Sequence, residues 1–223
     1  GAKPVLVDVK DDFNMDVSLA ERAIGPRTRA LMPVHLNGRL CDMDGVMALA
    51  EKHQLHVIED ACQSLVATFR GKMAGSFGSG CFSFYPFKAL GGFGDGGALT
   101  TNDPHVARVA TLLRYNGEDR ETGEFHYHGY TALLDNVQAA VLDVKLKHFP
   151  AWVEHRRRIA DQYRRGLSGL SGLSLPHFEG DAFRDSYQNY VIRSDRRDAL
   201  CAPNRTGAGT GVSQTPWAKL IPL

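Results

Sequence analysis

The sequence predicts an α/β fold built on a mainly parallel sheet, and two features carry that prediction. Strand-like apolar runs alternate with helical patterns over residues 4–114, and this alternation favours parallel strands joined by right-handed crossovers. After residue 132 the pattern changes to long helices followed by one convincing strand. We therefore expect one large α/β domain and part of a smaller α+β domain.

The elements of the large domain follow from local patterns. Residues 4–9 and 29–34 are expected to be strands, whereas residues 43–53 have helical periodicity with Asp42 as a candidate N-cap. Further strands are expected at residues 55–59, 80–84 and 98–101, and a further helix at residues 104–114.

The carboxyl-terminal half predicts two long helices and a linker. The helices are expected at residues 132–146 and 150–167, and the Gly-Leu-Ser repetition that begins near Ser168 marks the linker. Residues 186–194 are expected to be a strand of the smaller domain. We therefore divide the chain into a large domain, residues 1–147, and a bridging helix with a partial small domain, residues 148–223.

The composition is that of a soluble enzyme. The chain is 43% hydrophobic and 23% charged with a net charge of +1, which gives no reason to expect nucleic acid or an anionic membrane as a partner. We see no membrane-spanning apolar run and no signal peptide, so we expect a cytoplasmic protein. The nine histidines form no recognisable metal site. The cysteines are dispersed, which fits a reducing compartment; they are Cys41, Cys62, Cys81 and Cys201.

Residues 57–101 contain the residues from which function can be inferred. Asp60 closes an apolar strand, and Lys88 follows among aromatic and apolar neighbours. A lysine that holds an aldehyde as a Schiff base must lose its proton, which partial burial promotes. A pyridine nitrogen that acts as an electron sink needs an ionised carboxylate beside it. The pattern therefore indicates pyridoxal phosphate, with Gln63 and Ser83 as candidates for the ring hydroxyl and the phosphate.

Each of these residues also has a structural interpretation. An aspartate after a strand is commonly a helix N-cap or turn residue, and a lone lysine is commonly solvated. Ser83 can be a small core residue that bonds the backbone, and Gln63 can simply open a turn. The pairing of Asp60 with Lys88 favours the functional interpretation.

The glycine-rich segment after Lys88 formally matches a dinucleotide-binding fingerprint. Gly92-x-Gly94-x-x-Gly97 has the required spacing, but residues 98–101 look like a strand, whereas the fingerprint needs a helix there. We therefore expect the glycines to permit a tight loop beside the cofactor.

The motifs in this region resemble those of the DegT/DnrJ/StrS sugar aminotransferases, which are pyridoxal phosphate enzymes of fold type I. The matching motifs are Glu59-Asp60-Ala61-Cys62-Gln63, Phe82-Ser83-Phe84-Tyr85-Pro86-x-Lys88-x-Leu90-Gly91-x-x-Gly94-Asp95-Gly96-Gly97-Ala98 and Asp135-x-x-Gln138-Ala139-Ala140. The resemblance implies that Lys88 binds the cofactor covalently and moves the proton of the amino donor. It also implies that Asp60 pairs with the pyridinium, Gln63 with the ring hydroxyl and Ser83 with the phosphate, and that Cys62 lies against one face of the ring.

The resemblance also suggests a substrate class. The motif around Lys88 is similar to that of enzymes that aminate 3-keto nucleotide sugars, whereas 4-keto enzymes more often carry a glutamate where Asp95 stands. We therefore expect a homodimeric aminotransferase that takes its amino group from glutamate and prefers a 3-keto sugar. The sequence names neither the sugar nor the nucleotide.

Three departures from the family pattern support a rival hypothesis. Thr131 stands where the family has an asparagine that reaches the phosphate in the partner subunit. The family's preceding segment has no counterpart in the sequence, and residues 202–223 no longer follow the family. The rival is a truncated, non-catalytic remnant that keeps the fold and the dimer surface, and we expect the 223-residue chain alone to bind the cofactor weakly.

Overall fold

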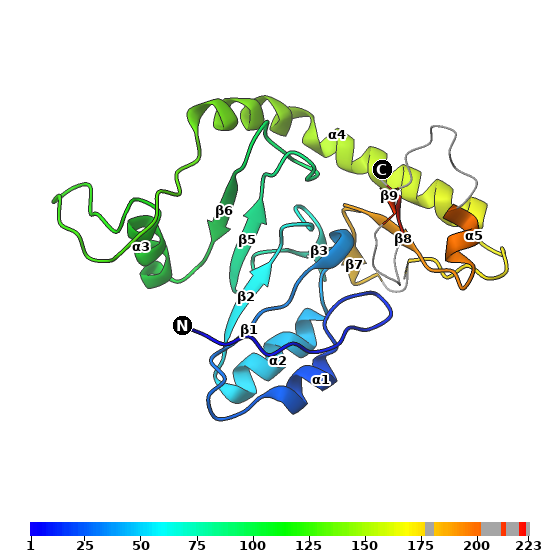
Figure 1. Cartoon of the computed structure of the whole chain (residues 1–223), viewed down its shortest axis with the longest axis horizontal. Coiled ribbons are helices and arrows are strands. Elements are labelled where there is room, and N and C mark those ends of the chain that lie inside the picture. The colour runs from blue at the N-terminus through cyan, green and yellow to red at the C-terminus, as the bar shows by residue number, and fades with distance from the viewer. Residues whose placement is uncertain (177–180, 202–210, 213–218, 222–223) are drawn as a thin grey trace.

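The computed structural model describes residues 1–176, 181–201, 211–212 and 219–221. Its central sheet has the strand order β1-β2-β5-β6, and the strands are β1 (Ala30–Leu31), β2 (His56–Asp60), β5 (Ser79–Ser83) and β6 (Gly97–Thr100). β1, β2 and β5 are parallel, and β6 runs antiparallel to β5 at the edge (Figure 1). The predicted α/β class and mainly parallel sheet are confirmed.

Two helices cover one face of this sheet. α1 (Val17–Ala23) and α2 (Met43–His53) share a core with β1 and β2 that includes Val46, Leu49 and Val57. The bounds of α2 match the prediction, and the Asp42 side chain accepts a hydrogen bond from Gly45 N–H as its N-cap. The opposite face is more open, since Ile58 is 38% and Leu99 47% exposed.

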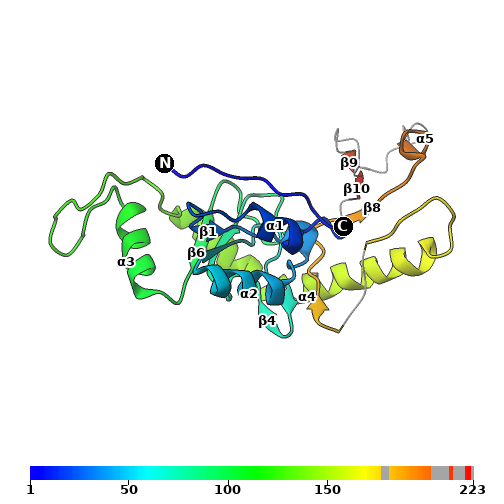
Figure 2. The same ribbon diagram turned by 90° about the horizontal axis from the view of Figure 1, so that it is seen from below.

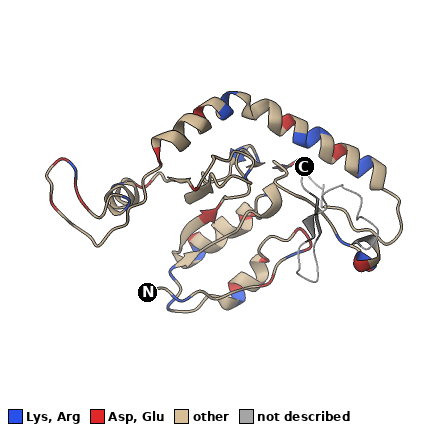
Figure 3. Ribbon diagram, turned by 45° about the horizontal axis from the view of Figure 1, so that its top comes forward, with Lys and Arg blue, Asp and Glu red and all other residues tan. Residues whose placement is uncertain are grey.

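The second half of the chain leaves the sheet and returns. α3 (Pro104–Leu113) leads into an extended arm, residues 114–135, which projects at one end of the molecule (Figure 2). α4 (Asn136–Leu167) then crosses beside the upper ends of β5 and β6 and continues toward β8 and α5 (Figure 1). Its later turns alternate basic and acidic side chains (Figure 3).

The prediction of two helices in this region was wrong. α4 runs unbroken through Pro150, although proline lacks the amide hydrogen that an inner helical position needs. Phe149 and Val153, on either side of Pro150, are 2% and 3% exposed in a core that also contains Leu90 and Leu142. Burial of these side chains outweighs the one lost hydrogen bond.

The remaining elements form two small sheets and short helical segments. One sheet has the order β4-β3-β7, and the other β8-β10-β9. Their strands are β3 (Thr68–Phe69), β4 (Lys72–Met73), β7 (Phe183–Arg184), β8 (Tyr190–Ile192), β9 (Gly211–Val212) and β10 (Lys219–Ile221). The helical segments are the 3-10 turn η1 (Leu36–Gly38) and α5 (Arg197–Cys201).

Three strand predictions differ from the structure. The strand predicted at residues 29–34 is reduced to β1 and a bridge between Val34 and Asp60. Residues 4–9 are extended but unpaired apart from a bridge between Val9 and Met15, and Leu6 is 92% exposed, because no described strand lies beside them. The strand predicted at residues 186–194 is reduced to β8 and a bridge at Arg193, since Ser186 and Asn189 bond to η1 instead. The divergent residues 202–210, 213–218 and 222–223 lie outside the described residues. No described helix combines the length and apolarity that crossing a membrane requires.

A cluster of hydrogen bonds surrounds the buried carboxylate of Glu59, near the carboxyl end of β2. Glu59 is fully buried; its Oε2 accepts from His35 Nε2 (3.0 Å) and Gly75 N–H (2.8 Å). Its Oε1 accepts from the N–H groups of Phe77 and Gly78, each at 2.8 Å. Burial alone raises the pKa of Glu59, but these four hydrogen bonds outweigh it and hold the pKa below the ordinary value.

We predict that Glu59→Gln lowers the free energy of unfolding at pH 7 by at least about 2 kcal/mol, because an amide nitrogen then faces two donors. Since the folded-state pKa is lowered from 4.5, the wild-type contribution is complete above that pH and is lost as pH falls through the lowered pKa. Denaturant unfolding between pH 3 and pH 7 measures both effects. Glu51→Gln, at an exposed position of α2, is the control, and an equal effect of the two variants would contradict the prediction.

Candidate cofactor site

The sheet brings two of the predicted site residues to the same edge. Asp60 is the last residue of β2 and pairs in register with Cys81 of β5. Ser83 is two residues further along β5 and is that strand's last residue. Because β2 and β5 are parallel, the carboxyl ends of both strands point to one edge, where ligands of open α/β sheets bind.

Asp60 is held firmly in place. Its N–H donates to Pro33 O and its carbonyl accepts from His35 N–H, both at 2.9 Å. Its Oδ1 accepts from Cys62 N–H at 3.1 Å. Both backbone groups and one carboxylate oxygen are therefore fixed within the protein, which sets the direction of the carboxylate.

Cys62 lies next to Asp60 in the turn that follows β2. Burial raises the pKa of its thiol to about 11, and the hydrogen bond and negative charge of Asp60 act in the same direction. The positive charge of Lys88 acts in the opposite direction. Cys62 follows the end of β2 and Lys88 follows the end of β5, so both belong to the same edge of the sheet.

Lys88 lies in a turn that follows β5. Its N–H donates to Tyr85 O at 2.8 Å, and Leu90, two residues later, is 5% exposed in the core formed with α4. Lys88 itself is half-buried. The aromatic residues before it do not enclose it as expected, since Tyr85 is 45% and Phe87 81% exposed. The turn directs these rings outward, and its apolar anchor is Leu90.

Ser83 and Gln63 both use an oxygen to fix the local backbone. Ser83 Oγ accepts from Tyr85 N–H at 3.2 Å, so its hydroxyl hydrogen remains the group that can be donated to an anion. Gln63 Oε1 accepts from the N–H of Asn37, a residue with a φ of 61°, at 2.8 Å. The Gln63 amide nitrogen is then the donor that can meet an oxygen of a ligand.

The glycine-rich loop packs against α4. Gln138 Oε1 accepts from the N–H groups of Phe93 (2.7 Å) and Gly94 (3.0 Å). A Cβ on Gly92 would lie 2.7 Å from the same oxygen, so the glycine permits this close approach. β6 begins at Gly97, and the loop therefore leads into a strand, as the sequence predicted, and not into the helix that a dinucleotide site requires.

The comparison with protein-family models identifies the family of this chain. Residues 1–212 match the model of the DegT/DnrJ/EryC1/StrS aminotransferase family. The chain belongs to that family. The resemblance found in the motifs around Asp60 and Lys88 thus extends over nearly the whole sequence.

Several family members are closely similar to this chain. The dTDP-3-amino-3,4,6-trideoxy-alpha-D-glucose transaminase of Streptomyces venezuelae is 44% identical over 202 residues, which are 90% of this chain and 53% of the relative. The UDP-N-acetyl-3-dehydro-alpha-D-glucosamine 3-aminotransferase of Acidithiobacillus ferrooxidans is 43% identical over 202 residues, covering 90% of this chain and 54% of the relative.

A solved family structure agrees with the fold. S. venezuelae DesV in complex with a ketimine intermediate matches with a TM-score of 0.85 at 42% identity, covering 90% of this chain and 54% of that chain. The chain spans about half the length of the curated relatives it matches.

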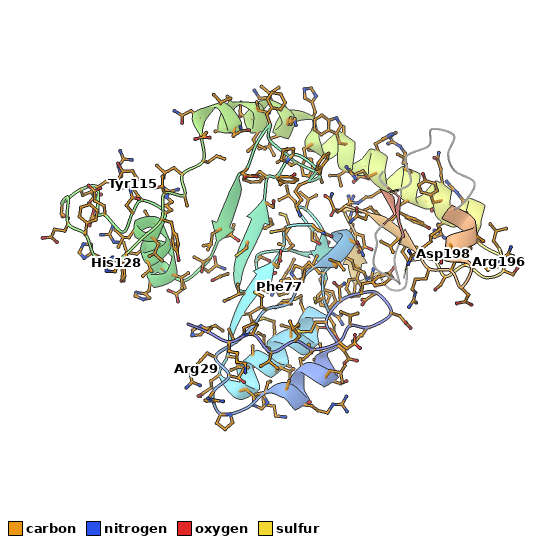
Figure 4. The ribbon with its side chains drawn as sticks, in the orientation of Figure 1. Arg29, Phe77, Tyr115, His128, Arg196 and Asp198 are labelled. Carbon is orange, nitrogen blue, oxygen red and sulfur yellow. The ribbon has the colours of Figure 1, made fainter. Side chains whose placement is uncertain are left out.

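The departure at Thr131 lies in the arm between α3 and α4. The Thr131 hydroxyl donates to Asn116 Oδ1 at 2.9 Å, and Tyr115 pairs with Thr131 through an isolated β-bridge. Figure 4 shows Tyr115 and His128 on this arm at one side of the molecule, whereas Phe77 lies near the centre. Within this chain, therefore, the structure does not bring Thr131 to Asp60 and Lys88. No group of three or more potential metal ligands occurs among the described residues.

Three residues that support the candidate site were not assigned roles from the sequence. Glu59 and Gln138 stand inside the matched motifs, and their buried or loop-facing positions become evident only in the folded chain. Gln188 bonds to both residues that flank Lys88. No local signal links it to Lys88, because 100 residues separate the two in sequence.

We predict that Asp60→Asn increases the alkylation rate of Cys62 near pH 8.5, because Asp60 raises the pKa of this thiol. Lys88→Met should do the opposite. The measurement is the rate of iodoacetamide modification of Cys62 against pH, followed by peptide mass spectrometry. Cys41, which is fully buried, should stay unmodified and so shows that each protein remains folded. Equal rates in all three proteins would show that the two charges do not converge on Cys62.

Proposed function

We propose that this chain carries the cofactor site of a pyridoxal phosphate-dependent aminotransferase that transfers an amino group from glutamate to a keto nucleotide sugar. The observation that supports this most directly is that parallel strands β2 and β5 bring Asp60 and Ser83 to one carboxyl edge of the sheet, where the turn that carries Lys88 begins. Family membership supports the same reaction class.

The residues at this edge fit the chemistry of the proposed cofactor. When bound, pyridoxal phosphate supplies an electron sink that stabilises negative charge on the α-carbon of an amino donor. Asp60 presents an anchored carboxylate for the protonated ring nitrogen, and Ser83 presents a hydroxyl donor for the phosphate. Gln63 presents its amide nitrogen for the ring oxygen, and Cys62 lies beside Asp60 to pack against the ring.

Lys88 has two proposed roles. Its amine would hold the cofactor covalently, and would move the proton at the α-carbon of the amino donor. Both roles need a fixed position, which the bonded turn at residues 85–88 supplies.

A 3-keto nucleotide sugar is the favoured acceptor. The names of both relatives described above specify a 3-amino or 3-dehydro sugar bound to a nucleoside diphosphate. Asp95, exposed in the glycine-rich loop, is the residue whose identity favours the 3-keto branch over the 4-keto branch. The identities of the sugar and of the nucleotide are left open.

We also propose a homodimer. The arm and the start of α4 expose large apolar side chains, which a second copy of the chain would cover. These include Phe125, Tyr130 and Val137, which are 69%, 69% and 68% exposed. The large-domain and small-domain division at residues 147 and 148 falls within α4, which would then bridge the two domains.

The proposed location is the cytoplasm. Cys41, Cys62 and Cys81, the cysteines whose side chains the structure describes, are free thiols, as is usual in a reducing compartment.

We predict that Lys88 is the covalent attachment point of the cofactor. Incubation with pyridoxal phosphate, borohydride reduction and peptide mapping should place the pyridoxyl group on Lys88, and Lys88→Ala should remove it. Lys147→Ala, at an exposed position of α4, is the control. A label on Lys72 or Lys145 would contradict the assignment. Absence of any label would favour the rival hypothesis, a non-catalytic remnant.

We predict that Asp60→Asn lowers amine transfer by at least about a hundredfold, because the variant keeps the shape of the side chain and removes the charge that holds the ring proton. Thermal unfolding should change little. Asp143→Asn, which removes an exposed carboxylate paired with Lys147, is the control. Near-normal turnover would refute the role of Asp60, and an equally large loss of stability would make that role structural.

A further inference from the structure

We propose that Gln188 is a positioning residue that fixes the orientation of Lys88. The role of Lys88 as a reactive residue rests on the proposed function, whereas the contact with Gln188 does not. The contact itself joins the segment at residues 185–189 to the turn that carries Lys88.

Gln188 bonds to the peptide groups on both sides of Lys88. Its Oε1 accepts from Ala89 N–H at 2.8 Å, and its Nε2 donates to Phe87 O at 2.9 Å. A single planar amide thus holds the residue before Lys88 and the residue after it. Together with the bond from Lys88 N–H to Tyr85 O at 2.8 Å, this fixes the backbone from which the lysine side chain extends.

The segment that carries Gln188 is itself anchored to the large domain. Ser186 N–H donates to Gly38 O at 2.8 Å, and Asn189 Nδ2 donates to Asn37 Oδ1 at 3.2 Å. A Cβ on Gly38 would lie 2.5 Å from Tyr187 N and 2.7 Å from Gln188 N. Gly38 therefore allows the two backbones to approach closely. The backbone that carries the Gln188 side chain is held in place as a result.

α4 holds the same segment from the other side. Arg156 donates to Tyr187 O at 3.2 Å, and Arg157 donates to Asp185 O at 2.9 Å. Asn37, which bonds Asn189, also donates its N–H to Gln63 Oε1 at 2.8 Å. Residues 185–189 thus connect α4, the Gln63 side of the candidate site and the Lys88 turn.

The hydrogen bond from Gln188 to Phe87 O lies at an exposed position. Phe87 is 81% exposed, and water would satisfy its carbonyl oxygen if Gln188 did not. The contact is therefore better suited to setting a direction than to supplying stability. A lysine that must reach one atom of a bound ligand gains from such restraint, because misplacement of a reactive group by about 1 Å is costly.

The test compares Gln188→Met, which removes both hydrogen bonds at similar volume, with two other variants. Gln188→Glu keeps the acceptor for Ala89 N–H and loses the donor to Phe87 O. Gln162→Met makes the same substitution at an exposed position of α4 and leaves the Lys88 turn untouched. All three are compared with wild type in the absence of cofactor, so the result does not depend on aminotransferase activity.

Two readouts are measured on each protein. The first is amide hydrogen exchange at Ala89. The second is competitive acetylation by trace acetic anhydride, expressed as the ratio of Lys88 to Lys147, whose exposed position on α4 makes it an internal reference. Because Lys147 is already exposed, it corrects for the amount of reagent, and denaturant unfolding of each protein identifies any general destabilisation. Release of the Lys88 turn changes the ratio in proteins of unchanged stability.

We expect Gln188→Met to increase exchange at Ala89 and the Lys88 labelling ratio by about fivefold or more, the factor for loss of one net hydrogen bond. Gln188→Glu should restore most of the protection at Ala89 but only part of the labelling ratio, and Gln162→Met should match wild type in both. Wild-type values in Gln188→Met, or equal changes in Gln162→Met, would overturn the inference. If Gln188→Met does not fold, a wild-type labelling ratio in Gln188→Glu would overturn it instead. Failure of the proposed function would appear separately, as absence of the pyridoxyl label on Lys88.

Discussion

The buried carboxylate of Glu59 is the interaction on which the candidate site depends. It accepts four hydrogen bonds from His35 and from the turn at residues 75–78, and so ties β2 to the segments that precede and follow it. Because side chains alternate along a strand, a Glu59 that points into the core directs Asp60 to the opposite face. The position of the proposed cofactor-binding carboxylate is therefore set by its buried neighbour.

The rest of the site is assembled from segments that pack around this strand end. β5 ends at Ser83, two residues beyond the Cys81 that pairs with Asp60, and the turn after β5 carries Lys88. α4 supports that turn through the core around Leu90 and fixes the glycine-rich loop through Gln138. These contacts use backbone groups to a large extent, which explains why glycines occur where the loop meets α4.

The sequence predicted the fold class and the bounds of α2, because each depends on local periodicity or capping. It proposed the candidate residues from Asp60 to Lys88 from a short motif. It did not predict that α4 continues through Pro150, because the compensating burial of Phe149 and Val153 involves distant residues. The exposure of Phe87 and the contact of Gln188 with the Lys88 turn were missed for the same reason. Short-range sequence patterns identify candidate reactive side chains. The contacts that hold those side chains in position join residues far apart in the sequence, and such patterns do not show them.

The most direct test of the central claim is amine transfer by the purified chain loaded with pyridoxal phosphate. Glutamate labelled with ¹⁵N would be supplied with a panel of 3-keto and 4-keto nucleotide sugars, and the products would be followed by mass spectrometry. The account predicts ¹⁵N in the amino sugar formed from a 3-keto substrate and none with Lys88→Ala. No transfer to any member of the panel by a chain that holds the cofactor on Lys88 would contradict it.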